Sequence, residues 1–108
     1  MSVSLSVKRR GQSADTALLI PLASHETFRR HWLPASRKLN LIWIPMFETG
    51  IPLQPGDVPD IVEELQTLKD WSELNSPEVA DVISDSIERA LAELRAPRTE
   101  NEVDIYIG

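Results

Sequence analysis

The longest apolar run in the chain, Leu41-Ile42-Trp43-Ile44-Pro45-Met46-Phe47, constrains the fold more than any other stretch, because every segment before and after it is amphipathic. A continuous apolar run of this length, bounded by polar or turn residues, is typical of a strand that other elements cover. We therefore predict that residues 41–47 form a buried strand. No group in the run can cleave, transfer or ligate a substrate, so the run predicts a fold and no reaction.

Two strands are predicted at the start of the chain. Val3, Leu5 and Val7 alternate with polar residues, which is the two-residue period of a half-buried strand. A polar turn that contains a glycine follows. Residues Thr16–Leu22 are then predicted to return as a second strand and to close a hairpin with the first.

A short helix is predicted after this hairpin. Ser24 is a good N-cap, and Phe28 and Trp32 after it fall on one helical face. Pro34 should interrupt the helix, because proline lacks an amide proton and restricts the residue before it. The alternative is that Pro34 opens a second turn that runs toward Lys38.

Two longer helices are predicted after the apolar run. Asp57 is expected to cap the first, with Pro59 in the first turn, where proline is tolerated. Pro77 lies in the first turn of the second, which has the cleanest helical period in the chain. The stripe that should face the core comprises Val79, Val82, Ile83, Ile87, Ala90, Leu91 and Leu94.

Two further strands complete the predicted sheet. Ile51–Leu53 reads as a short strand, and Pro52 should place it at an edge of the sheet. Val103–Ile107 alternates apolar and polar residues, so the chain should end inside the sheet. We predict a single two-layer α+β domain over residues 1–108, with an antiparallel or mixed sheet of four to five strands and two or three helices on one face.

The composition argues against several classes of function. The chain has no cysteine, which rules out a disulfide framework and thiolate chemistry. His25 and His31, the two histidines, are six residues apart and cannot form the paired ligands of a helical metal site. No glycine-rich phosphate loop and no nucleophile elbow is present. We predict a protein that is not an enzyme and that uses no cofactor and no metal.

Membrane and nucleic-acid partners are not expected. The run Ala17–Ala23 after Lys8-Arg9-Arg10 imitates a signal peptide, but Pro21 breaks it, and no run approaches the roughly 18 apolar residues of a spanning helix. Three clustered basic residues on an acidic chain are a weak footprint for nucleic acid. We therefore predict a cytoplasmic protein.

Charge is divided unevenly along the chain, whose net charge is −6. Residues 1–40 hold seven basic and two acidic residues, a balance of +5, whereas residues 57–95 hold three basic and eleven acidic residues, a balance of −8. Like charges four residues apart, such as Asp60 with Glu64 and Asp81 with Asp85, destabilise a helix slightly. A chain that keeps such pairs is expected to use them for binding rather than for stability. We predict that an acidic helical face binds a basic protein partner. Its candidate residues are Asp60, Glu63, Glu64, Asp81, Asp85 and Glu88. The alternative is that these acids only keep the protein in solution.

Three stretches of the chain together resemble small bacterial immunity proteins of polymorphic toxin systems. They are Leu41–Phe47, the turn and strand Gly50-Ile51-Pro52-Leu53, and the helical stretch Glu63-Glu64-Leu65-Gln66-Thr67-Leu68. The resemblance covers about half of the chain, includes no signature motif and transfers no residue role. It implies a protein that binds and neutralises one cognate toxin, and a toxin encoded nearby is the partner to expect.

Two other functions stay open from the sequence. One is a structural subunit of a bacterial assembly that self-associates through the opposed charges of its two halves. Such a homo-oligomer should lose mass in light scattering on dilution and with added salt. The other is a small enzyme or ligand-binding domain without a recognisable motif.

Overall fold

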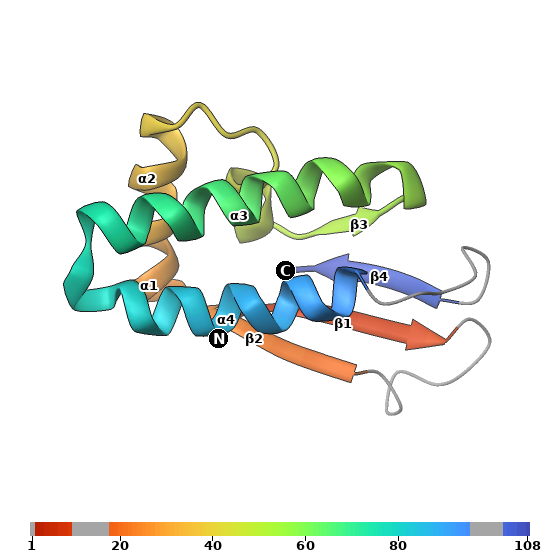
Figure 1. The fold of residues 1–108 in the computed structure, drawn as a ribbon. Helices are drawn as coiled ribbons and strands as arrows, with labels where there is room; N and C mark the ends of the chain where they lie inside the picture. The colour runs from red at the N-terminus through yellow and green to blue at the C-terminus, as the bar shows by residue number, and fades with distance from the viewer. Residues whose placement is uncertain (1, 10–17, 96–102) are drawn as a thin grey trace.

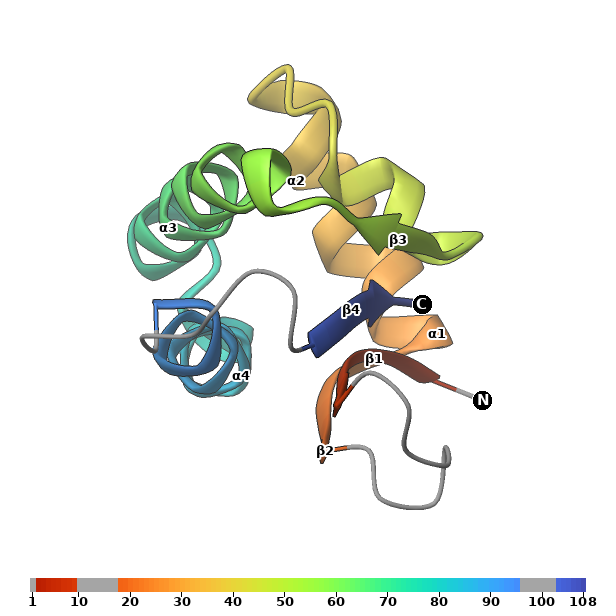
Figure 2. The ribbon, with the colours of Figure 1, turned by 90° about the vertical axis from the view of Figure 1, so that its right-hand side faces the viewer.

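The computed structural model describes residues 2–9, 18–95 and 103–108 of the chain (Figure 1). Its elements, in chain order, are β1 (Ser2–Arg9), β2 (Leu18–Ser24), α1 (His25–Thr27), η2 (Phe28–Trp32), α2 (Leu33–Lys38), η3 (Ile44–Glu48), β3 (Ile51–Leu53), η4 (Pro55–Asp57), α3 (Val58–Asn75), α4 (Pro77–Arg95) and β4 (Val103–Ile107). The strands form one antiparallel sheet, and α3 and α4 lie side by side along it, as Figure 2 shows end-on. The predicted two-layer α+β fold is confirmed.

The sheet has the strand order β2-β1-β4-β3, so β1 and β4 are its inner strands. Val3, Leu5 and Val7 of β1 are buried, which confirms the predicted alternation. β3 lies at an edge, as Pro52 predicts, because proline has no N–H for a further strand. β4 pairs with both β1 and β3, so the C-terminal strand lies inside the sheet as expected. Residues 16–17, predicted as the start of the second strand, lie outside the described residues.

The run Leu41–Phe47 does not form the predicted strand, because a loop there leads into the 3-10 helix η3. Pro45 lacks the N–H that a buried strand needs on its ladder but suits the first turn of a helix. Ile44 and Phe47 are both buried, since the three-residue period of a 3-10 helix brings them onto one side. Ile42, in contrast, is 71% exposed. Only part of the apolar run therefore belongs to the core.

Pro34 does not interrupt the helical segment that Ser24 caps. The Ser24 hydroxyl oxygen accepts a hydrogen bond from the N–H of Thr27 at 3.1 Å. The helical segment then continues through Pro34 to Lys38, so the alternative, in which the proline opens a further turn, is the correct one. The turn before the proline, Phe28–Trp32, is π-helical. A regular helix would bring the proline ring against the carbonyl one turn earlier, and a π-helical turn is a known way to relieve that contact.

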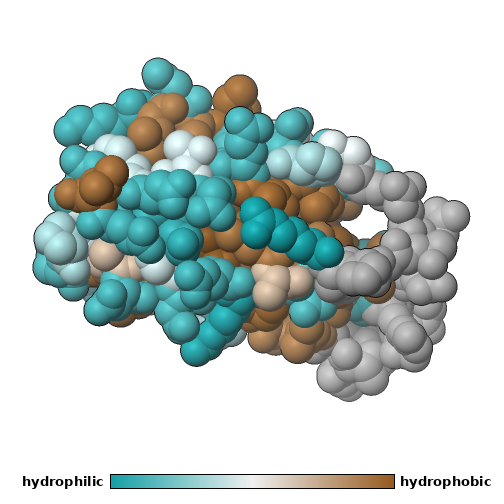
Figure 3. Space-filling model, viewed as in Figure 1, coloured by the Kyte–Doolittle hydropathy of each residue, from teal (hydrophilic) through white to brown (hydrophobic). Residues whose placement is uncertain are grey.

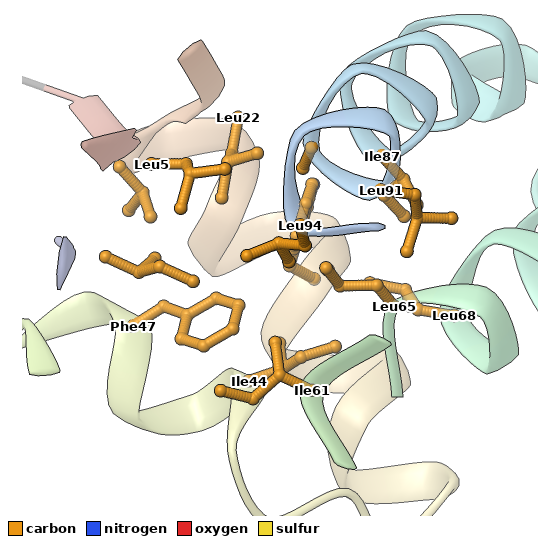
Figure 4. Close-up of a cluster of buried hydrophobic side chains, with 14 of the residues drawn as sticks. Leu5, Leu22, Ile44, Phe47, Ile61, Leu65, Leu68, Ile87, Leu91 and Leu94 are labelled. Atoms are coloured by element: carbon orange, nitrogen blue, oxygen red, sulfur yellow. The ribbon is translucent and has the colours of Figure 1, made fainter. Parts of the chain in front are cut away.

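The core lies between the sheet and the two long helices (Figure 4). Leu65 and Leu68 of α3 face Leu91 of α4 there, together with aliphatic side chains of the strands. The sequence also placed Val82 on this buried stripe, which is wrong, because Val82 is 64% exposed while Ile83 is 2% exposed. Successive side chains on a helix point about 100° apart, so Val82 points away from the core while its neighbour Ile83 points into it.

The start of α3 differs in detail from the prediction. A 3-10 turn, η4, precedes it, and the Asp57 carboxylate accepts the N–H of Gln54 at 3.0 Å in a capping box for that turn. Asp57 therefore does not cap α3 with its side chain. Pro59 does lie at the start of α3, as predicted.

Candidate functional site

The side chain of Glu64 on α3 binds three consecutive backbone amides where the loop after α2 enters η3. The N–H groups of Ile42 and Ile44 donate to its two carboxylate oxygens at 3.1 and 3.2 Å, and the N–H of Trp43 lies 3.0 Å from Oε1. Successive N–H groups that converge on one point attract an anion, and hydrogen bonds to a charged acceptor are stronger than neutral ones. Glu64 therefore ties the loop after α2 to the surface of α3.

The end of α2 delivers the loop to this position. Asn40 has a φ of 58°, the left-handed conformation that asparagine adopts more readily than most residues. The N–H of Leu41 donates to the carbonyl of Ser36 at 2.9 Å, the six-to-one bond of a Schellman motif. The chain thus leaves the helix in a sharp turn and crosses above α3 (Figure 1).

A cavity of about 270 Å³ lies between this loop and α3. Its lining comprises Leu41, Ile42 and Trp43 of the loop and Asp60, Glu63, Glu64 and Thr67 of α3. Asp60 and Glu63 are exposed, and their carboxylates have no ion pair within the part of the chain that the structure describes. The hydroxyl of Thr67 donates to the backbone carbonyl of Glu63 at 2.8 Å, so its oxygen lone pairs stay free to accept. The cavity therefore has one apolar wall and one acidic wall.

The other three predicted residues lie on α4, outside this cavity. Asp81 is exposed, and Asp85 pairs with Arg89 at 2.9 Å on the same helix. Glu88 lies 3.5 Å from Lys69 of α3. Figure 3 shows this side of the molecule, where hydrophilic surface covers much of both helices and hydrophobic surface shows in the hollow between them.

Lys69 is the centre of a polar seam between the two helices. Its ammonium group lies 3.6 Å from Glu73 and 3.5 Å from Glu88, and the hydroxyl of Ser84 donates to Glu73 at 3.0 Å. Desolvation lowers the pKa of Lys69, but the attraction of Glu73, Glu88 and Asp70 outweighs it, so the pKa lies above the usual lysine value. Glu88 therefore has a partner inside the fold, and its charge is partly neutralised.

The structure thus divides the six predicted residues into two groups. Asp60, Glu63 and Glu64 meet at the cavity on the loop side of α3, whereas the other three lie along α4. Glu64 has its oxygens occupied by amides. Asp60 and Glu63 lie beside the apolar wall and have no ion pair with any residue that the structure describes.

The sequence did not predict the apolar wall of this cavity. Leu41, Ile42 and Trp43 were assigned to a buried strand, and Thr67 was not singled out. Pro45 is the local signal that argues against a strand, because an inner strand excludes proline. No local signal shows that Glu64 supplies the acceptor for the three amides, since that contact spans about twenty residues.

Two properties of the described residues bear on the class of site. Over residues 2–9, 18–95 and 103–108, no group of three or more histidine, cysteine, aspartate or glutamate side chains is placed to hold a metal ion. Within the same ranges, no helix is long and apolar enough to cross a membrane.

The comparisons with known proteins give no family for this chain. No protein-family model, no curated protein and no solved structure matches it.

Proposed function

We propose that this chain is a non-enzymatic protein-binding module that acts in the cytoplasm as an immunity or inhibitor protein and neutralises a cognate toxin. It binds a basic partner through the acidic side of α3. The observation that carries this proposal is the cavity whose rim holds two unpaired carboxylates, Asp60 and Glu63, next to the exposed side chain of Ile42.

The composition of this rim suits a protein interface. Protein interfaces combine an apolar centre that is desolvated on binding with polar groups around it. Ile42 and Trp43 supply apolar surface, and Asp60 and Glu63 supply charge that no ion pair within the described residues neutralises. Unpaired charges at an interface raise the association rate of a partner of opposite sign.

The sign of the charge favours one class of partner. A toxin that acts on a nucleic acid or another phosphate substrate carries a basic cleft, and an acidic inhibitor surface competes for that cleft. The net charge of −6 and the acidic balance of residues 57–95 also favour a basic partner.

The first experiment is to co-purify the product of the adjacent reading frame with this protein. We expect a stable complex that weakens with added salt, because screening reduces attraction between the two surfaces. The matched test replaces Asp60 and Glu63 by lysine, and the control replaces Asp81 and Asp85, with the same change in net charge. Loss of the complex in the first variant alone supports the α3 side as the interface. A neighbour that does not bind, or equal retention in both variants, contradicts the proposal.

Self-association is a second candidate, which one further observation favours. Arg37 and Lys38 are exposed at the end of α2, and the described part of the chain offers them no ion pair. They can meet the acidic surface of a second copy. Light scattering distinguishes this from the inhibitor, since a homo-oligomer loses mass on dilution and in salt while an inhibitor stays monomeric until its partner is added.

A further inference from the structure

We infer that the cavity between residues 41–43 and α3 receives the side chain of one arginine from the basic partner. This inference rests on the proposed function and names the group that the cavity recognises. It follows from the two unlike walls of the cavity, and from which of its carboxylates have no partner among the described residues.

The apolar wall fits the stem and the plane of an arginine. Leu41, Ile42 and Trp43 line this side, Ile42 is exposed, and Leu41 and Trp43 are half-buried. The three methylene groups of arginine bury well against aliphatic side chains while the charged end stays beside polar groups. The guanidinium plane also stacks on aromatic faces and is more weakly hydrated than an ammonium, so its transfer into a partly apolar cavity costs less.

The acidic wall fits one guanidinium group and not a metal ion. Three carboxylates line the cavity, but the oxygens of Glu64 already accept the amides of residues 42–44. Asp60 and Glu63 are three residues apart on α3 and therefore neighbours on its surface. Two carboxylates and the hydroxyl oxygen of Thr67 offer the acceptors that the five N–H donors of arginine need.

The test is a titration of the full chain with N-acetyl-L-arginine amide, followed by the backbone and indole N–H signals of the protein in NMR. N-acetyl-L-citrulline amide is the matched probe, because it has the same shape without the charge. N-acetyl-L-lysine amide has the charge without the plane. We expect saturable shifts at Ile42, Trp43 and Thr67 with the arginine probe, weaker shifts with lysine and none with citrulline.

The matched variant is Asp60→Asn together with Glu63→Gln, which removes both charges and keeps the shape of the wall. We expect the shifts with the arginine probe to disappear in this variant, while the rest of its spectrum stays that of the native protein. Equal shifts with arginine and citrulline, or shifts that persist in the variant, contradict the inference. So does the absence of saturation up to about 100 mM probe, since even a Kd of about 1 mM corresponds to only about 4 kcal/mol.

Failure of the arginine pocket and failure of the proposed inhibitor function give different results. If the partner binds and the lysine variants of Asp60 and Glu63 release it, but the arginine probe does not saturate, the arginine pocket is wrong and the acidic interface stands. If the arginine probe saturates as expected but no basic protein binds, the pocket stands and the inhibitor function is wrong.

Discussion

The carboxylate of Glu64 lies 3.0 Å from the backbone nitrogen of Trp43, a residue twenty-one positions earlier in the chain. Together with the bonds to the two neighbouring amides, this contact holds the loop after α2 against α3 and forms one wall of the cavity. The residue that the sequence marks as a free surface charge is thus part of the fold.

Replacement of Glu64 by alanine should therefore destabilise the protein. Three amide N–H groups lose their acceptor, of which those of Trp43 and Ile44 are partly buried and that of Ile42 is exposed. An unsatisfied group of this kind costs on the order of 1–3 kcal/mol when fully buried. Because water reaches this loop, we expect a total loss of about 1–3 kcal/mol in the free energy of unfolding, measured by urea denaturation. Glu63→Ala, at the neighbouring position, is the control and should cost less than about 0.5 kcal/mol. Equal losses in both variants would show that the amide contacts do not stabilise the loop.

The sequence predicts the regular elements of this fold well, for a physical reason. β1, β4 and the two long helices bury one side and expose the other, so their periods of two and 3.6 residues are visible in the order of apolar residues. Ser24 is predictable as a cap because its partner N–H is only three residues away. These signals are local, and the structure confirms them.

Residues 41–47 could not be placed from the sequence, because their partner is remote. Hydrophobicity alone does not distinguish a buried strand from a loop and a 3-10 helix, and the acceptor for the amides of Ile42, Trp43 and Ile44 is a side chain on α3. The candidate site shows the same limit. Its acidic residues on α3 were predicted as part of a helical face. Its apolar residues, Leu41 to Trp43, line the site only because the loop after α2 packs against α3.

Aspartate at Val82 and at Ile83 should have very different effects on stability. Ile83 is 2% exposed, so Ile83→Asp places an unpaired charge in the core and should unfold the protein. Val82 is 64% exposed, and Val82→Asp should change the free energy of unfolding by less than about 0.5 kcal/mol. Thermal melts followed by circular dichroism measure both, with Asp81→Asn as a third, mild variant. Similar melting temperatures for the two aspartate variants would contradict the packing of α4.

Gly50 should be intolerant of a side chain. Its φ is +92°, which strains any other residue, and a Cβ atom there would overlap the side chain of Tyr106. We expect Gly50→Ala to cost about 1–3 kcal/mol, measured by urea denaturation. In a Tyr106→Ala background the same change should cost less, because only the backbone strain remains. An equal cost in both backgrounds would show that the tyrosine contact does not contribute.

The polar seam around Lys69 should weaken at alkaline pH, where Lys69 loses its charge. The attraction of Glu73 and Glu88 raises the folded-state pKa of Lys69 above the usual lysine value, so the stabilisation is present below the usual value and is lost as pH rises through the folded pKa. Lys69→Met should lower the melting temperature at neutral pH and low salt, and this difference should shrink in about 1 M salt. The two proteins should converge at strongly alkaline pH. A difference that is constant across pH and salt would mean that Lys69 acts through packing alone.

The most direct test of the acidic α3 interface is the rate at which the basic partner associates, measured by stopped flow at several salt concentrations. Two variants with the same net charge are compared, Asp60→Lys with Glu63→Lys on α3 and Asp81→Lys with Asp85→Lys on α4, each checked for native circular dichroism. We predict that the α3 variant associates at least about tenfold more slowly than the native protein at low salt and loses most of its salt dependence, while the α4 variant stays closer to native. Equal slowing in both variants would mean that only net charge matters, and a native rate in the α3 variant would contradict the proposed interface.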